Sequence, residues 1–230
     1  MLPELRDINL CNRFDMPVRK IPKNYRNVTG IAASGKAVGA AQFESTLERD
    51  FLALLEFSPD VEQFEVQPVV VKWHNEQGAP RSYTPDVLVK FKADTNRIPW
   101  LCEVKYRADI GKNWGDLHPK FLQGIRIAKQ NGWCFRLITE VEVRTPYLEN
   151  VRFLMPFRFR AVPENDSERL LDRLRVGSGM TPTAIIESMS PNRQEQAEWL
   201  PVLWRLIAEH RVGVDLDVAL TMNSPLWSLS

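Results

Sequence analysis

Three charged residues interrupt apolar stretches that have the character of β-strands. Asp86 directly precedes a run of three apolar residues, and Glu103 and Lys105 interrupt a second apolar run. Because successive side chains of a strand point to opposite faces, Glu103 and Lys105 share a face from which Val104 points away. If the two runs are neighbouring strands, all three charged groups converge at one edge of a sheet. Such a group suits a hard divalent cation with oxygen ligands, and the ammonium could hold a water or a phosphate.

The spacing of these residues matches a known nuclease pattern. Pro85-Asp86 is followed, 17 residues after the aspartate, by Glu103-x-Lys105, which is the signature of the PD-(D/E)xK nucleases. Short patterns of this kind also arise by chance. The alternative is that Glu103 and Lys105 form a surface ion pair on an edge strand while Asp86 caps a turn. A third acidic residue near the same point would favour the nuclease.

Residues 43–57 supply a candidate for that third acid on a predicted helix. The apolar side chains follow the i, i+4, i+7, i+8 spacing of one helix face: Leu47, Phe51, Leu54 and Leu55. Glu48 lies on or beside this face. A carboxylate there needs a partner or a cation, because burying it unpaired is costly. The alternative is that Glu48 only borders the face and pairs with Arg49 or a more distant base.

The elements that follow predict an α/β core whose sheet carries the acids. The expected strands cover residues 61–73, 83–91 and 98–106, with a hairpin turn at 75–78 between the first two. A helix is expected at 116–131 and a buried strand at 133–139. The side chains expected on the inward face of this helix are Leu117, Phe121, Leu122 and Ile125. The order is therefore helix, three-strand meander, helix, strand.

Composition narrows the class of protein. A chain of 230 residues fits one domain, or one domain with a small appendage. There is no apolar run of membrane-spanning length and no signal-peptide pattern at the N-terminus, so we expect no membrane association. The three cysteines are an odd number, which favours reduced thiols in a cytoplasm. Three histidines and no CxxC motif disfavour a zinc site.

Charge is segregated along the chain although the net charge is only +1. Residues 1–36 and residues 105–130 each carry a net charge of +4, whereas residues 164–230 carry −4. Basic segments on both sides of the acidic site indicate contact with a polyanion, and an acidic tail indicates contact with a protein. A solvated charged face remains the alternative explanation of any one segment. The candidate DNA-binding residues are Arg19, Lys20, Lys23, Arg26, Arg107 and Lys112.

Four segments together resemble the TnsA family, the endonuclease subunit of heteromeric cut-and-paste transposases, including CRISPR-associated ones. The segments are FESTLERDFLALLEF, VEQFEVQPVVV, YTPDVLV and CEVKYR, and the lead-in RKIPKNYRNVTG is similar as well. The resemblance covers roughly residues 19–160 and implies a restriction-endonuclease-like fold. It also implies that Glu48, Asp86 and Glu103 hold the metal and that Lys105 is the catalytic lysine. With the backbone carbonyl of Val104 every proposed ligand is a hard oxygen, which favours Mg²⁺, with Mn²⁺ as a substitute, over Zn²⁺.

The resemblance further implies a function and partners. A member of this family cuts the 5′ strands at transposon ends, while a DDE-type transposase cuts the 3′ strands and an AAA+ ATPase regulates both. We therefore expect a DNA endonuclease of the bacterial cytoplasm. Two alternatives stay open: a stand-alone restriction or repair nuclease that uses the same site, and an assembly module whose nuclease fold is vestigial.

The sequence divides into three expected parts. Residues 1–42 form a basic arm, residues 43–163 the nuclease domain, and residues 164–230 a C-terminal domain. Helical patterns at 166–174, 184–189 and 193–210, followed by strands near 211–220 and 224–229, predict a small winged-helix-like domain. Because its net charge is −4, we expect it to dock another transposase subunit rather than follow phosphates.

Overall fold

The computed structural model describes residues 29–177 and 179–229. The chain divides into two compact units, Met1–Val143 and Arg144–Ser230. This boundary precedes the expected one at 163/164, because helix α5 (Pro146–Arg158) packs against helix α8 (Arg193–Ala208) of the second unit. The expected arm is also more structured than anticipated, since its described part contributes strands to the first unit.

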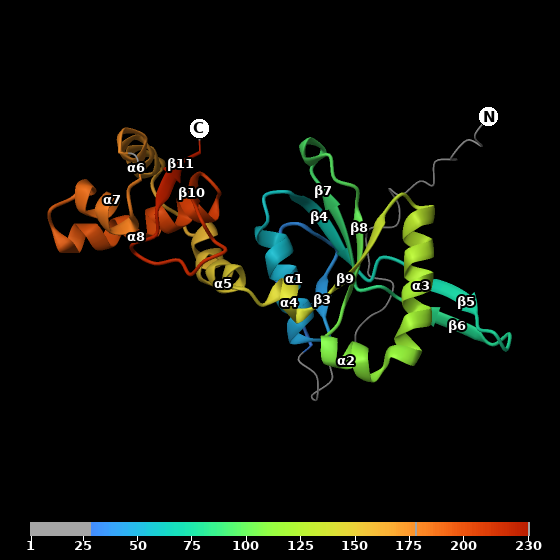
Figure 1. Cartoon of the computed structure of the whole chain (residues 1–230). Helices are drawn as coiled ribbons and strands as arrows, with labels where there is room; N and C mark the ends of the chain where they lie inside the picture. The colour runs from blue at the N-terminus through green and yellow to red at the C-terminus, as the bar shows by residue number, and fades with distance from the viewer. Residues whose placement is uncertain (1–28, 178, 230) are drawn as a thin grey trace. The chain divides into compact units, whose positions relative to one another are not determined.

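The first unit is built on a five-stranded mixed sheet (Figure 1). The strand order is β2-β4-β7-β8-β9, in which the central strand β7 is antiparallel to both β4 and β8, and each outer pair is parallel. The strands are β2 (Ala37–Val38), β4 (Val61–Val66), β7 (Val87–Phe91), β8 (Trp100–Val104) and β9 (Cys134–Ile138). The expected meander is thus confirmed as β4-β7-β8. A separate pair, β1 (Gly30–Ala32) and β3 (Ala41–Phe43), precedes the first helix.

Two helices cover the sheet from opposite sides (Figure 1). Helix α1 (Thr46–Phe57) begins at Ser45, whose side chain accepts a hydrogen bond from the Glu48 backbone N–H. Helix α3 (Trp114–Gln130) packs on β9, and its Ala128 lies in a buried cluster with the cross-strand pair Leu88 and Leu101. The expected order of helix, meander, helix and strand is therefore present, with the short helices α2 (Arg107–Lys112) and α4 (Glu140–Val143) added.

The inward face of α3 differs from the expected one. Leu122 and Ile125 are 50% and 49% exposed, whereas Gly124 and Ala128 face the sheet. A Cβ atom at position 124 would lie 2.6 Å from the ring of Phe135, so the helix approaches the sheet too closely for a side chain there. The apolar pattern predicted Leu122 and Ile125 on the buried face, but close packing of the helix on the sheet requires the small residues Gly124 and Ala128 there.

The long β-run at 61–73 is two strands in two sheets, not one. Strand β4 ends at Val66, and Gln67 takes a left-handed backbone conformation with φ of 52°. The chain then forms a separate hairpin from β5 (Val71–His74) and β6 (Pro80–Tyr83) before it returns as β7. The expected turn at 75–78 is present, but it joins β5 to β6 and not to β7.

The second unit consists of four helices and a two-stranded ribbon. After α5 come α6 (Glu164–Val176), α7 (Pro182–Met189) and α8, then β10 (Val212–Val214) and β11 (Leu226–Ser228). The three helices and ribbon agree with the expected outline, although the strand near 211–220 is only three residues long. In the part of the chain that the structure covers, no helix has the length and apolar character needed to span a membrane.

Glu65 makes the stability of the first unit depend on pH. Burial within β4 raises the pKa of this carboxyl from 4.5 to about 7, and nearby Lys90 only partly offsets the shift. An acid whose pKa is raised in the folded state favours folding below its unfolded pKa, and this contribution is lost as pH rises from about 4.5 to 7. From pH 5 to pH 8, we expect the unfolding free energy of Glu65→Gln to rise by about 1–2 kcal/mol relative to that of wild type. This figure is reduced because solvent screens part of the effect.

Urea denaturation at both pH values measures this difference. Subtracting the wild-type unfolding free energy at each pH cancels the contributions of other groups that titrate in the same range. A stability difference between Glu65→Gln and wild type that is the same at pH 5 and pH 8 would show that Glu65 ionises normally.

A candidate nuclease site

The backbone around Asp86 locks this residue to the neighbouring strand. Its N–H donates to the Cys102 carbonyl at 3.0 Å, and its Oδ2 accepts from the Val104 N–H at 2.7 Å. The carboxylate is therefore held at the end of β8, where the chain continues to Lys105. The convergence expected from the two apolar runs is present, because β7 and β8 pair directly.

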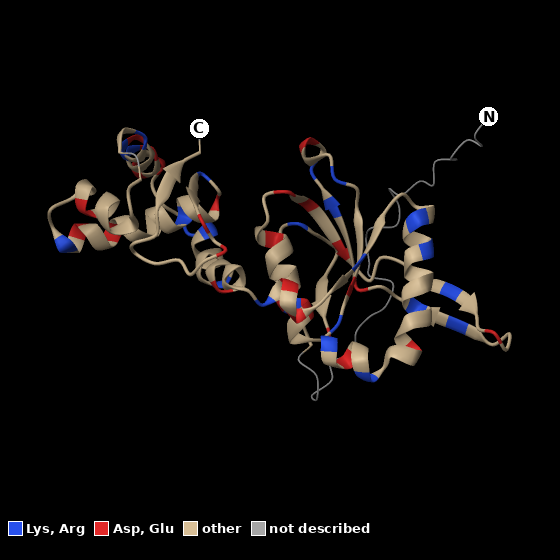
Figure 2. Ribbon diagram, viewed as in Figure 1, with Lys and Arg blue, Asp and Glu red and all other residues tan. Residues whose placement is uncertain are grey.

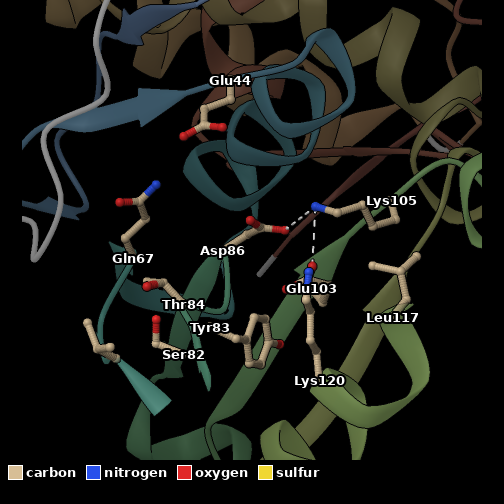
Figure 3. Close-up of a pocket in the computed structure, with 11 residues that line it drawn as sticks. Glu44, Gln67, Ser82, Tyr83, Thr84, Asp86, Glu103, Lys105, Leu117 and Lys120 are labelled. Atoms are coloured by element: carbon tan, nitrogen blue, oxygen red, sulfur yellow. Dashed lines mark hydrogen bonds and ion pairs between the residues drawn. The ribbon is translucent and has the colours of Figure 1, made fainter. Parts of the chain in front are cut away.

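Lys105 bridges the acids of the two strands (Figure 3). Its Nζ lies 3.5 Å from Asp86 Oδ2 and 3.2 Å from Glu103 Oε1. It also donates to the carbonyl oxygen of Val104 at 3.2 Å. Three oxygens from two strands thus face one cationic group. Glu103 is 4% exposed, so this is not the surface ion pair that was the alternative interpretation.

Helix α1 places Glu48 close enough to Asp86 and Lys105 for their charges to act on it, although Glu44, and not Glu48, is the acid of this segment that lines the cavity. The Glu48 carboxylate accepts hydrogen bonds from the Glu44 N–H at 2.8 Å and from the Ser45 hydroxyl at 3.0 Å. Together with the Glu48 N–H that donates to the Ser45 hydroxyl oxygen, these contacts form a variant of the capping box, in which the Glu44 N–H replaces that of the N-cap Ser45. The hydroxyl of Thr46 lies 2.9 Å from that of Tyr106, which joins the start of the helix to the end of β8.

Three carboxyl groups, those of Glu48, Asp86 and Glu103, interact with the single ammonium group of Lys105. Burial, and then the nearby Asp86, raise the pKa of Glu48 to about 7 and that of Glu103 to about 8. Burial likewise raises the pKa of Asp86, against the effect of Lys105. Burial alone would lower the pKa of Lys105, but Asp86, Glu103 and Glu48 together raise it, so the ammonium stays charged. The raised pKa values mean that the acids hold protons near neutral pH, because one ammonium cannot offset three ionised carboxylates; a bound divalent cation would favour their ionised forms.

The donor atoms fit a divalent cation of the Mg²⁺ type. Among the residues described, no three acidic, histidine or cysteine side chains are close enough as placed to hold an ion. However, Asp86, Glu103 and the Val104 carbonyl already face a common cation, the Lys105 ammonium, at 3.2–3.5 Å. These atoms are all oxygens, which suits Mg²⁺ or Mn²⁺.

The cavity that contains Asp86, Glu103 and Lys105 is also lined by residues that the sequence did not single out, and Tyr83 and Gln67 are two of them (Figure 3). The Tyr83 hydroxyl lies beside Glu103; burial and Glu103 raise its pKa, so it stays protonated. Among the described residues, neither the Tyr83 hydroxyl nor Glu103 Oε2 has a partner at hydrogen-bonding geometry. The signal available in the sequence was that Tyr83 lies two residues before Pro85 and three before Asp86.

Gln67 is the second of these residues, and its environment is strained. It is 7% exposed, has a left-handed φ of 52°, and donates its N–H to the Asp86 carbonyl at 2.8 Å. Its Oε1 is buried without a hydrogen-bond partner among the residues described. A Gln-Pro pair inside an otherwise continuous β-run was the signal in the sequence.

The candidate DNA-binding residues fall into two groups. Arg107 and Lys112 are exposed on α2, which begins two residues after Lys105, and the Arg107 N–H donates to Glu140 at 2.9 Å. They therefore follow the site directly along the chain. Arg19, Lys20, Lys23 and Arg26 lie outside the described residues.

Comparison with known proteins adds to this geometry. Residues 58–140 match the family model described as TnsA-like endonuclease N terminal, and residues 142–216 match the one described as TnsA endonuclease C terminal. The first match contains Asp86, Glu103 and Lys105, whereas Glu48 precedes it. A search of curated proteins finds no match to the chain.

The orphaned amide oxygen of Gln67 predicts a gain in stability on substitution. Gln67→Met replaces the buried polar group with an apolar chain of similar shape, and we expect the free energy of unfolding to rise by about 1 kcal/mol. Urea denaturation in EDTA measures it, with the half-buried Gln63 of β4, changed to Met, as the control. A loss of stability for Gln67→Met would mean that the amide oxygen has a partner in solution.

Proposed function

Because the chain belongs to the TnsA endonuclease family, we propose that it hydrolyses the 5′ strands at transposon ends while a partner transposase cuts the 3′ strands. The observation that carries this proposal is the convergence of Asp86, Glu103 and the Val104 carbonyl on one cationic group. The restriction-endonuclease-like fold of the family explains why strand ends carry these residues.

In this proposal the acids hold Mg²⁺ and Lys105 acts beside them. Asp86, Glu103 and the Val104 carbonyl would be ligands, with Glu48 completing the set from α1. When bound, Mg²⁺ supplies activation of the attacking water and neutralisation of charge at the phosphate. Lys105 then moves from the acids toward the phosphate, where its ammonium serves as a point charge that steadies the phosphate or orients the water.

The second unit would serve assembly. Its residues 164–230 carry a net charge of −4, which disfavours contact with phosphates there, whereas residues 144–163 carry +3 and bring the whole unit to −1. We propose that it docks another transposition subunit, in the first place the DDE-type transposase, with an AAA+ ATPase as regulator. The basic residues that follow Lys105, namely Arg107 and Lys112, would contact DNA, together with Arg19, Lys20, Lys23 and Arg26.

Removing a site residue should abolish 5′-strand cutting. In a reconstituted reaction with the transposase partner, Mg²⁺ and strand-specifically labelled end DNA, we expect Asp86→Ala and Lys105→Ala each to lose on the order of 10²-fold or more in rate. Asp94→Ala is the matched control, because Asp94 is exposed in the loop at the other end of β7. Full 5′-strand cutting by Asp86→Ala would refute the site, and cutting by the isolated wild-type chain would refute the need for a partner.

Calorimetry tests the metal separately from cleavage. We expect Mg²⁺ or Mn²⁺ to bind the wild-type chain, and Asp86→Ala to lose that binding, because the substitution removes a ligand oxygen. Urea denaturation of the variant without metal shows that it is folded. Metal binding that does not depend on Asp86 would contradict the ligand assignment, and the absence of binding to wild type would favour a vestigial nuclease.

A further inference from the structure

A basic groove runs from the catalytic cavity along the β5–β6 hairpin. Its lining includes Trp73, Arg81, Ser82, Asp116 and Lys120, and we call it the hairpin groove. Ser82 and Lys120 line the catalytic cavity as well, so the two hollows share a border. A strand of DNA whose phosphate lies at Asp86 and Lys105 could therefore continue into the groove without leaving the surface.

The cations of the groove have no partner in the protein. Arg81 is exposed and Lys120 half-buried, and neither forms a hydrogen bond or an ion pair with any residue in 29–177 or 179–229. Asp116 is the acidic residue in the lining. Arg81 lies directly across the hairpin from Trp73, so the guanidinium and the indole share one face of the ribbon. This combination of unpaired cations and an aromatic surface is typical of a nucleic-acid track.

The other side of the hairpin continues the same charge. A second hollow between β5 and α3 is lined by Lys72 and Arg126, which also lack ion pairs within the described parts of the chain. Figure 2 shows basic residues on both strands of the hairpin and along α3. The hairpin is a two-stranded ribbon outside the central sheet; Ser82 and Tyr83 at its end reach the catalytic cavity, but its cations Lys72 and Arg81 form no ion pair within the described residues. Its charge is therefore not needed to build the fold.

We infer that the hairpin groove binds the phosphate backbone of the DNA next to the cleaved bond, with Arg81 and Lys120 as the contacting cations. The inference rests on the proposed function, because it assigns the substrate a path away from that site. These contacts are independent of base sequence, since they involve phosphates only. Their contribution should therefore depend on salt, because each neutralised phosphate releases counterions.

Binding of a random-sequence DNA duplex to the full chain tests this path. Fluorescence anisotropy in EDTA, over a series of salt concentrations, separates binding from cleavage. We expect Arg81→Gln and Lys120→Gln each to reduce the slope of log K against log salt by about 0.9, and the double variant by about 1.8. Lys92→Gln is the matched control, because Lys92 is exposed at the end of β7 remote from Asp86 and should leave the slope unchanged.

Each outcome has a defined meaning. A double variant with the wild-type slope, an equal effect of Lys92→Gln, or no binding of DNA by wild type would overturn the groove as a DNA path. Loss of partner binding with DNA binding intact would also overturn it, in favour of a protein surface. If the slopes change as expected but wild type does not cut in Mg²⁺ with its partner, the proposed function fails while the groove stands. If the variants leave the slopes unchanged but wild type cuts normally, the groove fails as a DNA path while the proposed function stands.

Discussion

The structure of the first unit depends on the burial of acids around one lysine. Asp86 and Glu103 come from neighbouring strands and face the Lys105 ammonium at 3.5 Å and 3.2 Å. Burial disfavours the charged form of a carboxyl group, and the nearby Asp86 adds to this effect, so the pKa values of Glu48 and Glu103 lie far above their ordinary range. One lysine balances only part of that charge. The site is therefore built at a cost that a bound cation would reduce, which is typical of functional sites rather than of structural ion pairs.

The surrounding elements hold this arrangement in place. The Val104 N–H fixes the Asp86 carboxylate, and the Thr46–Tyr106 contact joins α1 to the end of β8. The Glu48 carboxylate accepts hydrogen bonds from the Glu44 N–H and the Ser45 hydroxyl at the start of α1, and Asp86 and Lys105 both act on its charge. One carboxylate thus both caps the helix and adds charge to the site. The helix start and the site cannot shift independently.

The sequence predicted the parts of the site that follow from local alternation. Glu103 and Lys105 share a face because they are two residues apart in a strand, and Asp86 joins them because β7 and β8 are consecutive in the meander. The inward face of α3 was predicted correctly for Leu117 and Phe121 but wrongly for Leu122 and Ile125, because apolar periodicity does not reveal that the close approach of Gly124 requires a small residue. The domain boundary was placed too late because the packing of α5 on α8 is a long-range contact.

The break at Gln67 was the feature that sequence patterns could least reveal, and it connects the fold to the site. The β-propensity of residues 61–73 is continuous, so only a left-handed residue can end β4 at Val66 and turn the chain out into the hairpin. A glutamine in that conformation is unfavourable, and glycine would relieve the strain. Yet the side chain at this position reaches the catalytic cavity, which a glycine could not do. The same strained residue thus ends the strand, precedes the ribbon that carries Arg81, and contributes its side chain to the lining of the catalytic cavity. Strain of this kind persists where surrounding contacts hold it, and here the hydrogen bond from the Gln67 N–H to the Asp86 carbonyl does so.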